Sequence, residues 1–155
     1  MEIVKARKKM VAEIVRLNQV LKLRELSNLE VDWDNPCRIF EHLDDYSVVC
    51  DQDKVWAAIC LMTEKDHLEI YTLAVAEQMR QFGLGRLLIA FAEAQARLLG
   101  KKYLLVDSYC VFQARGFYEK CGFKLRGTRR AYGHQYYSMK KQIRPQRSWR
   151  NAQAV

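Results

Sequence analysis

The sequence lacks the segments and spacings that define several protein classes. No apolar run approaches the roughly 20 residues needed to cross a membrane, so we expect no membrane contact. Residues 1–9 are basic but have neither the apolar core nor the cleavage site of a signal peptide. The five cysteines include no Cys-x-x-Cys pair, which favours reduced thiols over a disulfide framework or a zinc site. We therefore expect a cytoplasmic protein without a bound metal.

Carboxylates are missing from the last quarter of the chain. No Asp or Glu follows Glu119, whereas the net charge of the whole chain is +8. The cations in this region include Arg126, Arg129, Arg130, Lys140, Lys141, Arg144, Arg147 and Arg150. Such a quarter can attract nucleic acid or an acidic ligand, or it can be a solvated face with a frayed tail. By contrast, the segment from Glu30 to Asp53 has eight carboxylates and one Arg.

At 155 residues the chain is expected to form one domain with a single core. We place this domain at residues 1–143 and expect residues 144–155 to form a basic, flexible tail. Apolar periodicity and turn residues predict strands at 1–7, 46–50, 54–62, 67–75, 103–106, 124–130 and 135–143. A hairpin is expected at 51–53, and the last two strands are expected to pair in antiparallel fashion around 132–133. Helical spacing is expected from Val11 to Leu26, and irregular structure from Ser27 to Pro36, with a turn at Asn35–Pro36. This order predicts a three-layer α/β/α domain with a mixed, mostly antiparallel sheet.

Two further helices are predicted in the second half of the chain. One follows Gly83 and ends at Gly100, with an apolar face made of Leu84, Leu87, Leu88, Phe91, Leu98 and Leu99. The other is expected at 110–121, capped by Ser108. Cys110 and Cys121 would then share one helix face, a spacing typical of core packing.

The most informative stretch is an apolar run, Leu73–Val75, followed by the glycine-containing loop Arg80–Arg86. Gly83 and Gly85 open a strongly helical segment and let the backbone approach a ligand closely. The first N–H groups of a helix have no internal partner and carry the positive end of its dipole. The stretch therefore predicts a binding site for phosphate, most simply a pyrophosphate.

Two common nucleotide motifs do not fit this loop. The chain has no Gly-x-x-x-x-Gly-Lys-Ser/Thr, and the dinucleotide-binding pattern requires a glycine where Leu88 stands. Instead, Arg80-x-x-Gly-x-Gly after Leu73–Val75 resembles the acetyl-CoA signature of the GNAT superfamily of N-acetyltransferases. The segment 114–123 is similar to the Ala-x-x-Phe-Tyr-Glu-x-x-Gly-Phe block of that family, and residues 1–17 are similar to its first strand and helix. Gln81 stands where the family commonly has a glycine.

The resemblance implies the family fold and direct acetyl transfer from acetyl-CoA to a primary amine, with no acyl-enzyme. The pantetheine arm is expected along Leu73–Val75, and the pyrophosphate in the following loop. A backbone N–H near Val75 is expected to stabilise the oxyanion. The cofactor-binding residues expected from the resemblance are Leu73, Ala74, Val75, Arg80, Gln81, Phe82, Gly83, Leu84, Gly85 and Arg86.

Tyr118 and Glu69 are the catalytic residues that the resemblance implies. Tyr118 is the candidate acid for the leaving thiolate, because the two groups have intrinsic pKa values within about two units; the alternative is an aromatic side chain that only packs. Glu69 is the candidate base and is expected to share a strand face with Tyr71 and Leu73; the alternative is an ordinary ion pair. His67 and His134 are rival bases.

The acceptor amine is left open by the sequence. The acid-rich segment from Glu30 to Asp53 suggests a cationic acceptor, such as a polyamine, an amino sugar or the amine of a basic peptide. Two other functions are considered: a non-catalytic acyl-CoA-binding module, and an acetyltransferase docked on nucleic acid through its basic tail. Dimers are frequent in such folds, so a homodimer is also left open.

Overall fold

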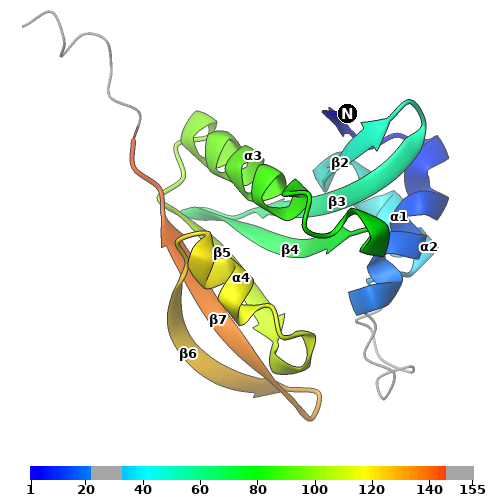
Figure 1. The fold of residues 1–155 in the computed structure, drawn as a ribbon. Coiled ribbons are helices and arrows are strands. Elements are labelled where there is room, and N and C mark those ends of the chain that lie inside the picture. The colour runs from blue at the N-terminus through cyan, green and yellow to red at the C-terminus, as the bar shows by residue number, and fades with distance from the viewer. Residues whose placement is uncertain (22–32, 146–155) are drawn as a thin grey trace, which may run out of the picture.

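The computed structural model describes residues 1–21 and 33–145, which form a seven-stranded sheet with helices on both faces (Figure 1). The strands are β1 Glu2–Lys5, β2 Tyr46–Asp51, β3 Lys54–Thr63, β4 His67–Val75, β5 Tyr103–Tyr109, β6 Lys124–Ala131 and β7 His134–Gln142. The helices are α1 Val11–Asn18, α2 Pro36–Glu41, α3 Leu84–Leu98 and α4 Arg115–Lys120. The strand order is β1-β2-β3-β4-β5-β7-β6, and among the described strands only β4 and β5 pair in parallel.

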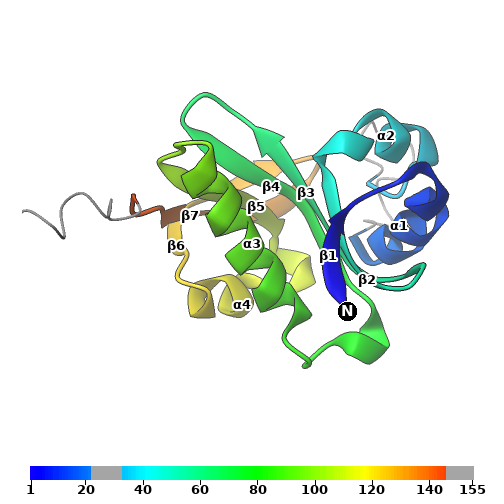
Figure 2. The same cartoon turned by 90° about the horizontal axis from the view of Figure 1, so that it is seen from above.

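The sheet separates two hydrophobic cores. On one face, α3 and α4 cover a core that includes Leu88, Leu104 and Met139. On the other face, α1 and α2 cover a core that includes Ile14, Ile39 and Val48. Figure 2 shows α3 and α4 on one side of the sheet and α1 and α2 beside its β1–β4 half. The predicted three-layer α/β/α architecture is confirmed.

The predicted hairpins are confirmed, and their turns have the required backbone conformation. Gln52 joins β2 to β3 with a φ of 53°. Tyr132 and Gly133 join β6 to β7 with φ values of 52° and 78°. The two consecutive positive φ values at Tyr132 and Gly133 are those of a type I′ turn, which matches the twist of the flanking strands.

Helix α3 lies where it was predicted, but its buried face differs from the prediction. The residues buried against the sheet are Leu84, Leu88, Ile89, Ala92 and Ala96. Leu87, Leu98 and Leu99 are 45%, 79% and 51% exposed, so their assignment to this face is wrong. The buried stripe repeats every four residues and ends in alanines, whose small side chains bring the helix close to the sheet.

The predicted helix at 110–121 is wrong in its first half. Strand β5 continues through Ser108 and Tyr109, which pair with β7, so Ser108 is a buried strand residue and not a helix cap. A 3-10 turn follows at Cys110–Phe112, and Gln113 then takes a φ of 53°. Helix α4 begins only at Arg115, so Cys110 lies outside it. Pairing with β7 therefore overrode the local helical pattern.

Helix α2 was missed by the sequence analysis. The Asn35 side chain accepts hydrogen bonds from the backbone N–H groups of Cys37 and Arg38, at 2.9 and 3.3 Å. Pro36 occupies the first helical position, where its missing N–H is harmless. Asn35–Pro36, predicted as a turn, is thus a helix start. Residues 22–32, and with them Leu26 and most of the expected irregular segment, lie outside the described residues.

Strands β4 and β5 separate partway along their length, and this fork positions the candidate site. Their parallel pairing ends at Ile70 with Val106. Beyond that point, β4 pairs only with β3 and β5 only with β7 among the described strands. One edge of Leu73–Val75 therefore faces an opening in the middle of the sheet, with unpaired backbone groups.

A β-bulge at Tyr71 changes the face on which later β4 residues lie. Tyr71 has no partner in the β3 register and is an extra residue in β4. It packs with the α1–α2 core, whereas Leu73 packs with the α3–α4 core. The expectation that Glu69, Tyr71 and Leu73 share one face is therefore wrong for Leu73, because the inserted residue shifts the alternation.

Candidate active site

An open cleft of about 1180 Å³ lies between the end of β4, the start of α3 and the segment 111–117. The residues predicted to bind the cofactor all line this cleft: Leu73, Ala74, Val75, Arg80, Gln81, Phe82, Gly83, Leu84, Gly85 and Arg86. Val111 and Phe117 line the opposite wall. The structure thus gathers the whole predicted set around one hollow.

The loop before α3 presents a group of unused backbone donors. Within the described residues, the N–H groups of Gln81, Gly83 and Leu84–Arg86 donate to no backbone carbonyl. The first carbonyl to accept from the helix is that of Gly83, which takes the N–H of Leu87 at 3.0 Å. Free donors at the positive end of a helix dipole form an anion site. The local chemistry therefore matches a pyrophosphate.

The two glycines of the loop are needed for different reasons. Gly83 takes a φ of 81° in open space, so its requirement is conformational. Gly85 has no such constraint, but a Cβ there would lie 3.0 Å from Phe117 Cζ. Gln81 also takes a left-handed φ, 74°, although it is not a glycine. Gln81 therefore adopts a conformation that glycine takes more readily.

A second, smaller pocket of about 50 Å³ occupies the fork between β4 and β5. It is lined by Leu21, Trp33, Ile70, Tyr71, Thr72, Leu73, Val106, Asp107, Ser108, Tyr109, Phe112 and Tyr118. Leu21, Leu73 and Phe112 also line the large cleft. The fork pocket therefore adjoins the large cleft.

Tyr118 lines the fork pocket from α4. Its side chain is 6% exposed and packs against Phe117 and Phe123, with ring centroids 5.1 and 5.4 Å away. No hydrogen bond to its hydroxyl occurs within the described residues. Burial raises the pKa of Tyr118 well above its usual value, so the hydroxyl stays protonated. The difference between the pKa of Tyr118 and that of a thiol is therefore larger than the intrinsic values suggest.

Glu69 lies on β4 just before the fork, on the face covered further along by α1 and α2. It lines neither the fork pocket nor the large cleft. Burial of its half-exposed side chain raises the pKa of Glu69, and the negative charges of Asp107 and Glu64 raise it further. No ion pair of Glu69 occurs within the described residues, which argues against the ordinary salt-bridge alternative.

The two rival histidines have different surroundings. His67 stacks on Tyr103 with ring centroids 4.7 Å apart, at the far end of β4 from the fork. His134 begins β7 and meets the Tyr109 ring edge-on at 6.1 Å. Because Tyr109 lines the fork pocket, only His134 adjoins the candidate site.

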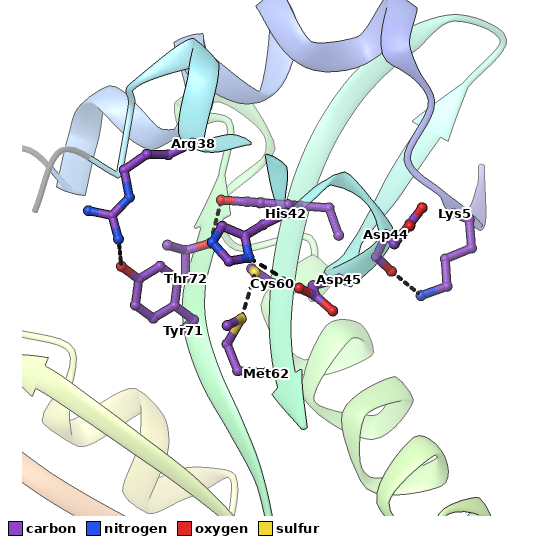
Figure 3. Close-up of polar contacts among 10 residues, drawn as sticks. Lys5, Arg38, His42, Asp44, Asp45, Cys60, Met62, Tyr71 and Thr72 are labelled. Atoms are coloured by element: carbon purple, nitrogen blue, oxygen red, sulfur yellow. Dashed lines mark hydrogen bonds and ion pairs between the residues drawn. The ribbon is translucent and has the colours of Figure 1, made fainter. Parts of the chain in front are cut away.

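Side-chain hydrogen bonds are made by both β4 residues at the bulge, Tyr71 and Thr72 (Figure 3). Arg38 donates to the Tyr71 hydroxyl at 3.1 Å, and Thr72 donates to the Tyr46 hydroxyl at 3.3 Å. Burial raises the pKa of Tyr46 to about 12, so this hydroxyl remains neutral. Burial also raises the pKa of the Cys60 thiol to about 12, which leaves it unreactive as a nucleophile.

Sequence reasoning missed several residues of the fork pocket, above all Asp107, Ser108 and Tyr109. A signal was available, because polar residues directly follow the buried run 103–106. Conversely, none of the described carboxylates between Asp34 and Asp53 lines the fork pocket. The inference of a cationic acceptor from this acid-rich segment therefore finds no geometric support among those residues.

Other classes of site are not formed by the described residues. Their His, Cys, Asp and Glu side chains include no group of three that could hold a metal ion. In the same part of the chain, no helix has the length and hydropathy to span a bilayer.

Comparisons with known proteins identify the family. The acetyltransferase (GNAT) family model matches residues 11–123. No curated protein matches the sequence. An aminoglycoside 6'-N-acetyltransferase complexed with coenzyme A superposes with a TM-score of 0.76 at 15% identity, covering 96% of this chain and 100% of its own.

Two further solved structures share the fold. The ribosomal-protein-S18-alanine N-acetyltransferase from Escherichia coli has a TM-score of 0.75 and 15% identity, over 96% of each chain. Ard1 from Thermoplasma volcanium has a TM-score of 0.75 and 18% identity, over 92% of this chain and 97% of its own. The family model, the sheet with its fork and the N–H-lined cleft lead to one conclusion: this chain belongs to the GNAT family of acetyltransferases.

Proposed function

We propose that this protein is an N-acetyltransferase that moves the acetyl group of acetyl-CoA directly to a primary amine of a small molecule or peptide. One observation carries the proposal: the free N–H donors of the loop and the unpaired edge of β4 line the same cleft. Family membership supports acetyl-CoA as the donor. A structural neighbour complexed with coenzyme A gives the same support.

The loop at 80–86 binds the pyrophosphate through its unused N–H groups, and Arg80 and Arg86 add positive charge. The pantetheine arm lies along Leu73–Val75 and pairs with the free strand edge, as an added strand does. Both contacts use the backbone, so they depend on conformation more than on side-chain identity.

Transfer takes place where the cleft meets the fork pocket. The neutral amine attacks the thioester carbonyl, and a backbone N–H near Val75 stabilises the oxyanion. The tetrahedral intermediate then collapses, the C–S bond breaks, and the acetyl group stays on nitrogen. The amine loses one proton and the thiolate gains one, so no acyl-enzyme is required.

Tyr118 is proposed to donate a hydrogen bond to the leaving sulfur. Its side chain is buried, and its protonated hydroxyl has no hydrogen-bond partner among the described residues. Because its pKa is raised, full proton transfer to the thiolate is uphill; a strong hydrogen bond to the developing charge costs less. Tyr118 therefore stabilises the thiolate until it is protonated.

Glu69 is proposed as the base that takes the proton of the amine, directly or through water. Its raised pKa lies closer to neutrality than that of an ordinary carboxyl, which suits a general base. It lies on the opposite sheet face from Tyr118, so the base and the Tyr118 hydroxyl approach the fork from different sides. His134, beside Tyr109, is the alternative base.

A thiol-release assay with acetyl-CoA and a panel of amines tests this function. We expect free coenzyme A to appear only with an accepted amine, and acetyl-CoA to raise the melting temperature of the protein. A rise in melting temperature without turnover on any amine would favour the alternative function, a non-catalytic acyl-CoA-binding module. The five free cysteines fit a reducing compartment, and we propose the cytoplasm.

A further inference from the structure

Half of one sheet face carries no helix in the described residues. On the face covered by α1 and α2, helix α1 packs over β3 and β4, and α2 packs against α1. Figures 1 and 2 show both helices at the β1–β4 end, away from β5, β7 and β6. Within residues 1–21 and 33–145, the strands β5, β7 and β6 therefore have an open sheet face that begins at the fork.

The alternation of β7 shows which side chains lie on this open face. Lys141 donates to Glu93 of α3 at 2.6 Å, so its side chain lies on the α3–α4 face. Lys140, the next residue along the strand, therefore lies on the open face, as does Tyr136 four residues earlier. There Lys140 Nζ sits 4.1 Å from the centre of the Tyr103 ring.

Strand β6 adds two exposed cations to the same face. Cross-strand partners share a face, and the register pairs Lys124 with Lys140 and Arg129 with Tyr136. Lys124 and Arg129 are exposed. We call Lys124, Arg129 and Lys140 the basic sheet face. No Asp or Glu lies anywhere in β6 or β7, so nothing in these strands neutralises it.

The charge changes sign where this face reaches the fork. Glu69 pairs with Leu105 across β4 and β5, so Asp107, two residues further along β5, lies near it on the same face. The charge of Asp107 also raises the pKa of Glu69. Neither carboxylate has an ion pair within the described residues. A ligand complementary to the whole surface therefore has an ammonium group at the fork and several anionic groups further along the sheet.

We propose that the acceptor amine belongs to an acidic polypeptide segment, which docks on the basic sheet face and directs its amine into the fork. This inference rests on the proposed function and names its substrate class. An α-amino or lysine amine supplies the nucleophile, and carboxylates nearby in the segment bind Lys140, Lys124 and Arg129. A polycationic acceptor would be repelled by these cations.

A nucleic acid fits this surface less well. Stacking of bases requires free aromatic faces, but the rings here contact one another. Tyr109 meets Trp33, Phe112, His134 and Tyr136 at interplanar angles from 60° to 88°. His67 and Lys140 flank the Tyr103 ring. Nucleic acids also lack the alkyl amine that the proposed reaction consumes.

The test compares short peptides that share one N-terminal residue and differ only in later charge: acidic, neutral or basic. Thiol release with acetyl-CoA gives kcat/KM for each, at low and at high salt. We expect the acidic peptide to be the best acceptor, with an advantage that shrinks as salt rises. The double variant Lys124→Glu with Arg129→Glu should lower kcat/KM for the acidic peptide about tenfold, mainly through KM.

The matched control is Lys8→Glu with Lys120→Glu, which changes the net charge equally at exposed positions outside this face. It should leave the peptide preference unchanged, and both double variants should keep the melting shift with acetyl-CoA. An equal loss in the control would overturn the proposal, as would a neutral peptide, a basic peptide or a small polyamine being preferred. Single-stranded RNA binding that depends on Lys124 and Arg129, without acidic-peptide turnover, would overturn it too. If no amine is acetylated, the proposed function itself fails.

Discussion

The cofactor cleft and the fork pocket adjoin each other at Leu73, yet they are built in opposite ways. Most of the cleft comes from one continuous stretch, residues 73–86, which offers backbone N–H groups and a free strand edge. The fork pocket collects side chains from segments far apart in the sequence, including Trp33, Tyr71, Asp107 and Tyr118. A site made of backbone follows from local conformation, whereas a site made of side chains depends on how the strands are arranged.

Tyr118→Phe tests whether the fork pocket performs chemistry or merely adjoins the cleft. We expect kcat to fall about 100-fold, as when a hydrogen-bond donor to a developing negative charge is removed. The fold should be unaffected, because Phe fills the same space and the lost hydroxyl has no hydrogen-bond partner among the described residues.

Single-turnover kinetics and urea unfolding check this prediction together. A fall in kcat with unchanged stability and unchanged acetyl-CoA affinity supports a role at the leaving sulfur. Full turnover by Tyr118→Phe would instead leave Tyr118 as a packing residue.

Gly85→Ala tests whether the cleft depends on close backbone packing. The added Cβ would lie 3.0 Å from Phe117 Cζ, so the ring that lines the cleft must move. We expect a loss of about 2 kcal/mol in the free energy of unfolding, as for other overpacked sites. The affinity for acetyl-CoA should fall at the same time.

Gly116→Ala is the control for this variant, because a Cβ at that helical position meets nothing within 4 Å. Alanine there should be neutral or slightly stabilising, since it favours helix more than glycine does. Urea unfolding and titration with acetyl-CoA measure both variants. Equal behaviour of the two would contradict the packing role assigned to Gly85.

Asp107→Asn and Glu69→Gln test the chemistry at the fork through the pH dependence of kcat/KM. The raised pKa of Glu69 means that activity is lost at a higher pH than for an ordinary carboxyl as the medium is acidified. Asp107→Asn removes a negative neighbour, which lowers the pKa of Glu69 and moves the acid limb of the kcat/KM profile to lower pH. Glu69→Gln should lower kcat about tenfold and abolish that limb.

As pH rises and Glu69 ionises, activity should increase whereas the stability of the fold should decrease. A carboxyl whose pKa is higher in the folded than in the unfolded state binds protons more readily when folded, so stability falls as pH rises through that window. Ionised Glu69 is therefore destabilising at neutral pH, and Glu69→Gln should raise the melting temperature slightly above that of the parent. An acid limb unchanged in both variants would assign the base to another group, with His134 next in line.

Particular residues show which features of the fold could be predicted from local sequence patterns. The hairpin at Tyr132–Gly133 and the start of α3 at Gly83 were predictable, because their turn chemistry lies within a few neighbouring residues. Ser108 was misassigned because a local cap pattern competed with pairing to β7. The bulge at Tyr71 left no local signal that was recognised, and it moved Leu73 to the other sheet face.

The sequence by itself determined the family resemblance, the layer order and the whole lining predicted for the cofactor cleft. These follow from contiguous residues, since helix starts, turns and strand edges are short-range properties of the backbone. Only the tertiary structure decided which side chains meet at the fork and which cations share the open face of β7 and β6. Those groupings depend on strand order, a bulge and the separation of β4 from β5, which bring together residues distant in the chain.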